Sequence, residues 1–244
     1  MGDSRAGPGA QPIATLAMRH HDEPSAPGFT LIELMIVVAI LAILASLAVP
    51  NLVSSRSTAN ENVTVATLRT VSTAQFRFKS MALIDADRAG SYEYGSLPEL
   101  SGVVDVRDIG ERLTPGLISA SFGAIDAAGI LNRQGYLYAL YLPSATGAGL
   151  PGIEANLAAV DARFAEQTYS LLAWPSAYGE TGRTAYFVTE QGEVLKSIPA
   201  RYSGTTAIPP AGAALVGVPA AHIVGGRLAS NAGGADGNTW LPVR

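Results

Sequence analysis

Residues 29–53 read FTLIELMIVVAILAILASLAVPNLV, and this stretch decides how the rest of the chain is organised. It contains a single charged residue, Glu33. As a helix it is long enough to cross a hydrocarbon core of about 30 Å. An apolar segment near an N-terminus can be a secretory signal that is cut off, or an anchor that stays in the membrane.

Glu33 is the residue that these two interpretations do not explain. Small residues at Ser46 and Ala48 fit an ordinary signal peptidase, which would leave Val49 as the new terminus. However, a carboxylate at membrane depth costs about 2.5–3.5 kcal/mol at the centre of a span, and less near its end. The acid therefore indicates a partner for its charge, or else an acid tolerated at the membrane interface; this residue alone favours neither.

The residues around Glu33 resemble a known processing site. Gly28-Phe29-Thr30-Leu31-Ile32-Glu33, followed by the long apolar run, is similar to the cleavage site of type IV prepilins and pseudopilins. The resemblance implies that a prepilin peptidase cuts between Gly28 and Phe29 and that the new amino terminus, Phe29, is methylated. It also implies that Glu33 neutralises the amine of a neighbouring subunit and sets the axial register during assembly.

The leader, residues 1–28, departs from the family pattern in two respects. Pro27 stands directly before the cleavage glycine, and the only fixed positive charges are Arg5 and Arg19. The positive-inside rule therefore gives little support for a cytoplasmic leader of this length. A start at Met18 would give a shorter leader, MRHHDEPSAPG, and both starts stay open.

The long helix is expected to continue beyond the apolar run to about Met81. Pro50 removes a backbone donor and predicts a kink. Residues 29–53 would form the transmembrane, filament-core half of this helix, and residues 54–81 an amphipathic half that forms the spine of a head. The predicted apolar face of the second half comprises Leu52, Ala59, Val63, Ala66, Thr70, Ala74, Phe78 and Met81.

The head, residues 82–198, is predicted to be an α+β fold in which a small antiparallel sheet packs on the long helix, as in pilins. It begins with a loop-rich stretch, in which residues 94–100 (YGSLPEL) resemble a segment of pilin-like proteins. A short helix is expected over residues 153–164. Strands are expected over residues 135–142, 168–174, 184–189 and 193–198, the last two joined by a hairpin turn. Residues 199–244, rich in Ala, Gly and Pro, are expected to form an extended or loosely packed tail that wraps the head or lies on the filament surface.

The composition offers little for catalysis or nucleic-acid binding. The chain is 48% apolar and 15% charged with a net charge of −4, and it has neither a basic stripe nor a cysteine. His222, in the tail, is expected to be a surface residue. Asp236 and Asn238 form a weak calcium candidate, and Asp85 with Asp87 a second thin pair of oxygen ligands. We therefore predict no enzyme, no cofactor and no metal.

The sequence thus predicts a structural filament subunit. The resemblance implies three kinds of partner: other pilin subunits, a prepilin peptidase and an inner-membrane assembly platform. The subunit would span the inner membrane once and then move to a cell-surface filament. Two alternatives are a pseudopilin of a type II secretion system and an extracytoplasmic binding protein anchored by its signal.

Overall fold

Helix α1, Leu31–Ser80, is the longest element of the chain, with 50 residues. It appears in the computed structural model, which describes residues 2, 28–198 and 201–243. The chain divides into two units, Met1–Ser46 and Leu47–Arg244. Almost all of the expected leader, including the choice between Met1 and Met18 as its start, lies outside the described residues. The expected helix from Phe29 to about Met81 is confirmed to within two residues.

Pro50 lies inside α1, with helical residues on both sides. Because proline has no backbone N–H, one carbonyl of the preceding turn loses its helical donor. Nearby side chains supply other donors to carbonyls of the helix: Ser46 Oγ to Ile43 O at 2.7 Å, and Asn51 Nδ2 to Leu47 O at 3.2 Å. The kink at Pro50 stays a prediction.

The second half of α1 buries a different face from the expected one. Of the residues proposed for that face, only Ala74 and Phe78 are buried, and the others are exposed. The buried face is half polar: Ser57, Thr64, Thr67, Leu68, Val71, Ala74, Gln75 and Phe78. Partners on the head explain why polar side chains can be buried there. Tyr138 Oη donates to Thr64 Oγ1 at 3.1 Å, and Gln75 exchanges two hydrogen bonds with the main chain of Gly95.

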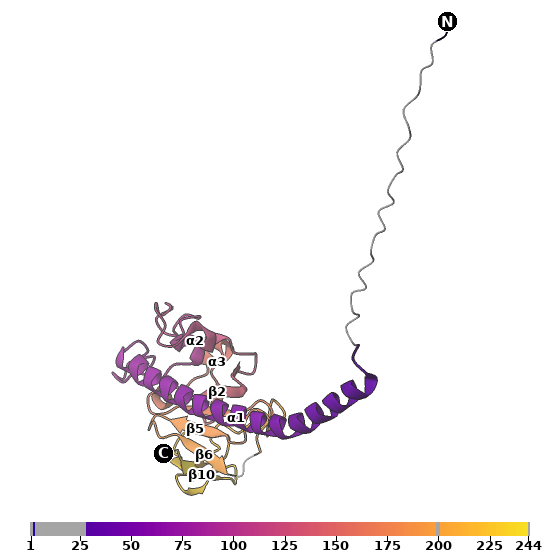
Figure 1. The fold of residues 1–244 in the computed structure, drawn as a ribbon. Helices are drawn as coiled ribbons and strands as arrows, with labels where there is room; N and C mark the ends of the chain where they lie inside the picture. Colours follow the sequence, from indigo (N-terminus) through magenta and orange to yellow (C-terminus); the bar gives the residue numbers. More distant parts are fainter. Residues whose placement is uncertain (1, 3–27, 199–200, 244) are drawn as a thin grey trace. The chain divides into compact units, whose positions relative to one another are not determined.

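The head is built on one antiparallel sheet, with strand order β1-β2-β4-β5-β6-β10-β9 and β3 paired to β2 (Figure 1). The four expected strands correspond to β2 Tyr136–Pro143, β4 Ser170–Pro175, β5 Tyr186–Thr189 and β6 Leu195–Ile198. Four strands of the sheet were not expected: β1 Ile130–Arg133, β3 Gly149–Pro151, β9 Ala232–Gly233 and β10 Thr239–Pro242.

Short helices occupy the connections. They are α2 Leu97–Leu100, the 3-10 turn η1 Ala120–Gly123, α3 Glu154–Leu157 and α4 Ala162–Ala165. The single helix expected over residues 153–164 is therefore wrong. There are two one-turn helices instead: α3 ends with Ala158 as its C-cap, and Asp161 caps α4, its Oδ1 accepting from the amide of Phe164 at 3.0 Å.

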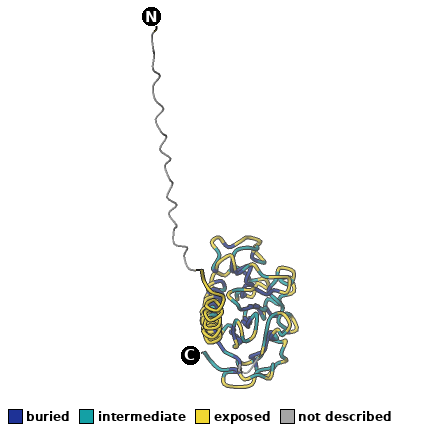
Figure 2. Tube along the Cα trace, turned by 45° about the vertical axis from the view of Figure 1, so that its right-hand side comes forward, coloured by how far each residue is buried: buried dark blue, intermediate teal, exposed yellow. Residues whose placement is uncertain are grey.

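The central strands are buried on both faces. Strand β4 is buried at every position, and β2 at all but one. Figure 2 shows the buried residues gathered in the interior of the second unit. Along β2, Tyr136, Tyr138 and Leu140 belong to the cluster that contains α1, whereas Leu137 and Ala139 belong to a second cluster. That second cluster is completed from the C-terminal segment by Ala211, Ala213, Ala214, Leu215, Ile223, Ala229 and Trp240. The sheet thus lies between α1 and the C-terminal segment.

The tail expected over residues 199–244 is only partly correct: the described residues 201–243 cover the head, but they pack closely against it and are not loose. Within residues 201–243, β7 Leu215–Val216 pairs with β8 Arg227–Leu228, and β10 joins the main sheet beside β6. Trp240 is fully buried, and its ring meets Phe187 edge-on at 6.0 Å. The glycines allow close packing: a Cβ on Gly212 would lie 2.0 Å from the carbonyl oxygen of His222. Small residues here signal close backbone approach, not flexibility.

A buried cluster of ion pairs links residues of the segment that follows α1. Arg107 Nη1 lies 3.1 Å from Glu99 Oε2, and Arg107 Nη2 lies 3.3 Å from Glu93 Oε2. The two acids are 0% and 2% exposed, and Arg107 is 12% exposed. Glu99 also completes a capping box with Ser96 at the start of α2. Burial raises the pKa of Glu93, and Arg107 opposes this rise.

Two adjacent glycines test the packing of the C-terminal segment. A Cβ on Gly234 would lie 2.2 Å from Ala213 O and 2.8 Å from Trp240 Cδ1, whereas a Cβ on Gly233 would meet nothing within 4 Å. We expect Gly234→Ala to cost about 1–3 kcal/mol of unfolding free energy. Thermal unfolding should then show a Tm lower by roughly 2–4 °C for each kcal/mol. Gly233→Ala should leave Tm almost unchanged, and equal effects of the two variants would contradict this packing.

Arg107→Met tests the ion cluster, because it leaves two carboxylates buried without their cation. We expect a loss of about 3–5 kcal/mol at pH 7. Without Arg107 the pKa of Glu93 should rise further, and a carboxyl whose folded pKa lies above its unfolded value loses stability as the pH rises through it. The deficit relative to wild type, measured by urea unfolding, should therefore be smaller at pH 4 than at pH 7. A deficit independent of pH would show that lost packing, not charge, is responsible.

Candidate functional site

The segment before α1 presents the expected cleavage bond openly. Gly28, Phe29 and Thr30 are exposed and have no regular secondary structure, and Phe29 is 73% exposed. A Cβ built on Gly28 would meet nothing within 4 Å, so the packing of the described residues does not require a glycine there. The bond between Gly28 and Phe29 therefore lies in an exposed segment without regular secondary structure, which a peptidase is able to reach. Cleavage there stays a prediction.

Thr30 and Glu33 together begin α1. The amide of Glu33 donates to Thr30 Oγ1 at 3.2 Å, and the amide of Leu34 donates to Thr30 O at 3.2 Å. Thr30 Oγ1 in turn lies 3.4 Å from Glu33 Oε2. Carboxylates are stabilised in the first turn of a helix, where unpaired N–H groups carry partial positive charge. Glu33 thus has a local role beside the intermolecular one expected. Sequence reasoning missed Thr30, although the spacing T-x-x-E is a known capping signal.

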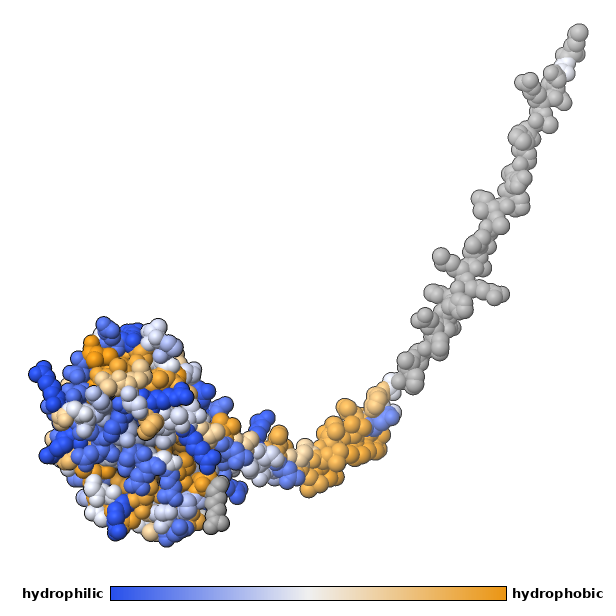
Figure 3. Space-filling model, turned by 90° about the vertical axis from the view of Figure 1, so that its left-hand side faces the viewer, coloured by the Kyte–Doolittle hydropathy of each residue, from blue (hydrophilic) through white to orange (hydrophobic). Residues whose placement is uncertain are grey.

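Beyond its first turn, the first part of α1 has an apolar surface on all sides. Its large apolar side chains between Leu31 and Val49 are exposed, from 42% at Val37 to 76% at Leu31. Figure 3 shows this stretch as a continuous hydrophobic surface. By length and composition α1 is able to cross a membrane. A helix that is apolar all round needs either lipid or other protein around it.

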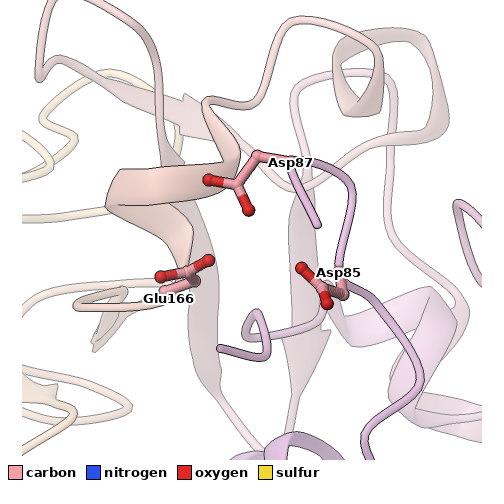
Figure 4. Close-up of side chains that lie close together, drawn as sticks. All are labelled: Asp85, Asp87 and Glu166. Atoms are coloured by element: carbon pink, nitrogen blue, oxygen red, sulfur yellow. The ribbon is translucent and has the colours of Figure 1, made fainter. Parts of the chain in front are cut away.

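Three carboxylates come together elsewhere, at the end of α1 (Figure 4). Oxygens of Asp85, Asp87 and Glu166 all lie within 4.8 Å of one another. The fold thus adds Glu166 to the pair noted in the sequence. Burial first, and then the charge of Asp87, raises the pKa of Glu166. Oxygen groups of this kind are ligands for hard cations. Exposed acidic groups also cluster without an ion, and these three carry no assigned role.

Asp236 and Asn238 form a hydrogen-bonded turn. Both oxygens of Asp236 accept hydrogen bonds: Oδ1 from the amide of Asn238 at 2.9 Å and from Trp240 Nε1 at 3.1 Å, and Oδ2 from Asn238 Nδ2 at 2.8 Å and from the hydroxyl of Tyr202. Four donors occupy the lone pairs that a calcium ion would need. This arrangement orients the turn before β10 and speaks against the weak calcium candidate.

His222 lies in the C-terminal segment, where its role is in the main chain. Its amide donates to Pro219 O at 2.9 Å, and its backbone bridges to Ala148. Its side chain is partly buried, so the surface position expected for it is only partly correct.

Comparisons with known proteins agree with the features of the N-terminal segment. Residues 25–49 match the family model described as the prokaryotic N-terminal methylation motif. Over 61 residues the chain is 48% identical to the type IV wide pilus major component PilA4 of Thermus thermophilus, a match that covers 25% of this chain and 44% of that protein. Over 78 residues it is 41% identical to the type IV major pilin protein PilA of Myxococcus xanthus, covering 31% and 34%.

The similarity is limited in extent, since the chain spans less than half the length of each of these relatives. No solved structure matches the chain. The methylation motif at residues 25–49 and the two pilin relatives support the assignment of this chain to the type IV pilin family.

Proposed function

We propose that the protein is a structural subunit of a type IV pilus or a related filament, and that it polymerises through the first half of α1. One observation carries the proposal: an exposed helical surface that is apolar except for Glu33 and Ser46 begins at Leu31, inside the methylation motif. The two relatives are named as a type IV wide pilus major component and a type IV major pilin, which supports a pilus role as the first choice.

Cleavage supplies a charge that assembly can use. A cut before Phe29 converts an amide nitrogen into an amine, one residue ahead of the Thr30 cap. In a bundle of apolar helices that amine needs a counter-charge, because removing one partner of a buried pair costs about 3–5 kcal/mol. Along residues 29–53, Glu33 is the only carboxylate that can provide it. Pairing the amine of one subunit with Glu33 of the next therefore lowers the cost of burial and defines the axial step.

The same features suggest how the subunit moves from the membrane into the filament. Residues 29–53 hold the uncut protein in the inner membrane as a single span, with the head outside. A prepilin peptidase releases the leader, and an assembly platform transfers the helix from lipid to the filament at the cell surface. In this proposal the subunit acts by packing its helix against those of other subunits and catalyses no reaction, so its role is structural and not enzymatic.

The mature terminus tests the processing step. We expect intact-mass and N-terminal peptide spectra of the protein from its native membranes to show a chain that begins at Phe29, with a methyl group on its amine. A terminus at Val49, or an uncut leader, would contradict the proposal and favour a secreted or membrane-anchored binding protein.

Glu33→Gln tests the charge pair, with Thr30→Val as the matched variant of the local cap. We expect Glu33→Gln to reduce incorporation into filaments by at least about tenfold, because an unpaired amine in the bundle costs more than the 1.4 kcal/mol that this factor represents. Thr30→Val keeps the charge and should assemble nearly normally. Immunoblots of sheared filaments and of membranes measure assembly and cleavage separately. Equal defects in both variants would mean that capping of α1, not charge pairing, is what matters.

Deletion of the subunit separates the two filament roles. Loss of surface filaments with intact protein secretion is expected for a pilus subunit. Loss of secretion with filaments intact would instead identify a pseudopilin of a type II secretion system.

A further inference from the structure

A groove of about 530 Å³ lies within the second unit, between α1 and the connection from β4 to β5. Val49, Pro50 and Val53 line one part of it, and Ser57, Glu61 and Arg183 line another. The walls are held together by contacts across the groove. Asn60 Nδ2 donates to Thr181 O at 2.9 Å, and the amide of Arg183 donates to Glu61 Oε1 at 2.9 Å. The groove is therefore formed by the fold without any ligand.

The position of the groove in the chain indicates what surrounds it. Its apolar lining consists of the last residues of the apolar run, residues 29–53. If that run spans the bilayer, as proposed above, the groove opens where hydrocarbon gives way to lipid headgroups. Polar and charged side chains at this depth contact headgroups in membrane proteins.

The polar lining carries both signs of charge. Arg183 is exposed, and its guanidinium forms no ion pair within the described residues. Glu61 is partly buried and uses one oxygen for the amide of Arg183, which leaves acceptor capacity on the carboxylate. Ser57 also lines the groove, and its hydroxyl is able to donate a hydrogen bond to a ligand there. The groove therefore offers a cation, a carboxylate and a hydroxyl to a polar ligand.

We propose that this groove binds the headgroup of a zwitterionic phospholipid that carries a primary ammonium, as in phosphatidylethanolamine. The inference rests on the proposed membrane insertion of α1. The ammonium donates to Glu61, and the phosphate accepts from Arg183 and Ser57. The acyl chains then run beside Val49 and Val53. A choline headgroup has no N–H to donate to Glu61, and a phosphatidylglycerol headgroup brings no cation to that carboxylate.

Native mass spectrometry of the full chain in mild detergent tests this selectivity. Phosphatidylethanolamine, phosphatidylcholine and phosphatidylglycerol with the same acyl chains are added at equal concentration. We expect the ethanolamine lipid to be retained several-fold more than either of the others. Arg183→Gln and Glu61→Gln should each reduce its retention by about tenfold, the effect of losing one charge-assisted hydrogen bond. Arg163→Gln, at an exposed arginine outside the groove, should leave retention unchanged.

Folding is controlled within the same set of variants. Arg183→Gln alters an exposed side chain and keeps the amide that binds Glu61, so its Tm should match that of wild type. Equal retention of the three lipids would overturn the inference, as would retention that neither variant reduces.

Two further outcomes separate this inference from the proposed function. A photo-crosslinker at Thr58, which lines the groove, should capture lipid in membranes; capture of a second copy of the chain in its place would overturn the lipid assignment. Flotation of the membranes checks insertion independently. A chain that does not float with membranes contradicts the proposed function, whereas an inserted chain without lipid preference contradicts only the present inference.

Discussion

The central strands of the head are buried on both faces, and this constraint organises the whole second unit. Strand β4 has no exposed position, so each face of the sheet needs a covering layer. Helix α1 supplies one layer through Leu68, Val71 and Phe78. The C-terminal segment supplies the other, with Trp240 as its largest side chain. Each large apolar side chain that is fully buried contributes about 1.5–3 kcal/mol, so neither layer can be removed without exposing costly surface.

The two covering layers pack against the sheet with different kinds of residue. Along α1 the buried face contains Thr64, Thr67 and Gln75, and hydrogen bonds to Tyr138 and Gly95 compensate for burying polar groups. The C-terminal segment instead packs by small residues, whose backbones approach closely at Gly212 and Gly234. Polar matching on one side explains why hydrophobicity alone did not identify the buried face of α1. Close backbone contact on the other side explains why it did not reveal the tight packing of the C-terminal segment.

The first part of α1 differs from the second, because its large apolar side chains are exposed. Its surface is apolar on all sides, no described residue covers it, and its one carboxylate belongs to the first turn. A surface of this kind is stable only in lipid or among similar helices. The head is complete without it, so folding of the head and burial of this helix are separate events. A subunit that first resides in a membrane and later joins a filament requires that separation.

The sequence by itself determined the features that depend on neighbouring residues. The run from Phe29 to Val53, the extent of α1 and four central strands were all predictable, because apolar periodicity and turn residues act locally. Three features were not predictable. They are the face of α1 that is exposed, the grouping of Glu166 with Asp85 and Asp87, and the hydrogen bonds that occupy the oxygens of Asp236. They join residues far apart in the chain, and their energies come from partners that only the fold supplies. The covering role of residues 201–243 belongs to this second group, because Ala and Gly carry no periodic signal and their effect arises only when two backbones meet.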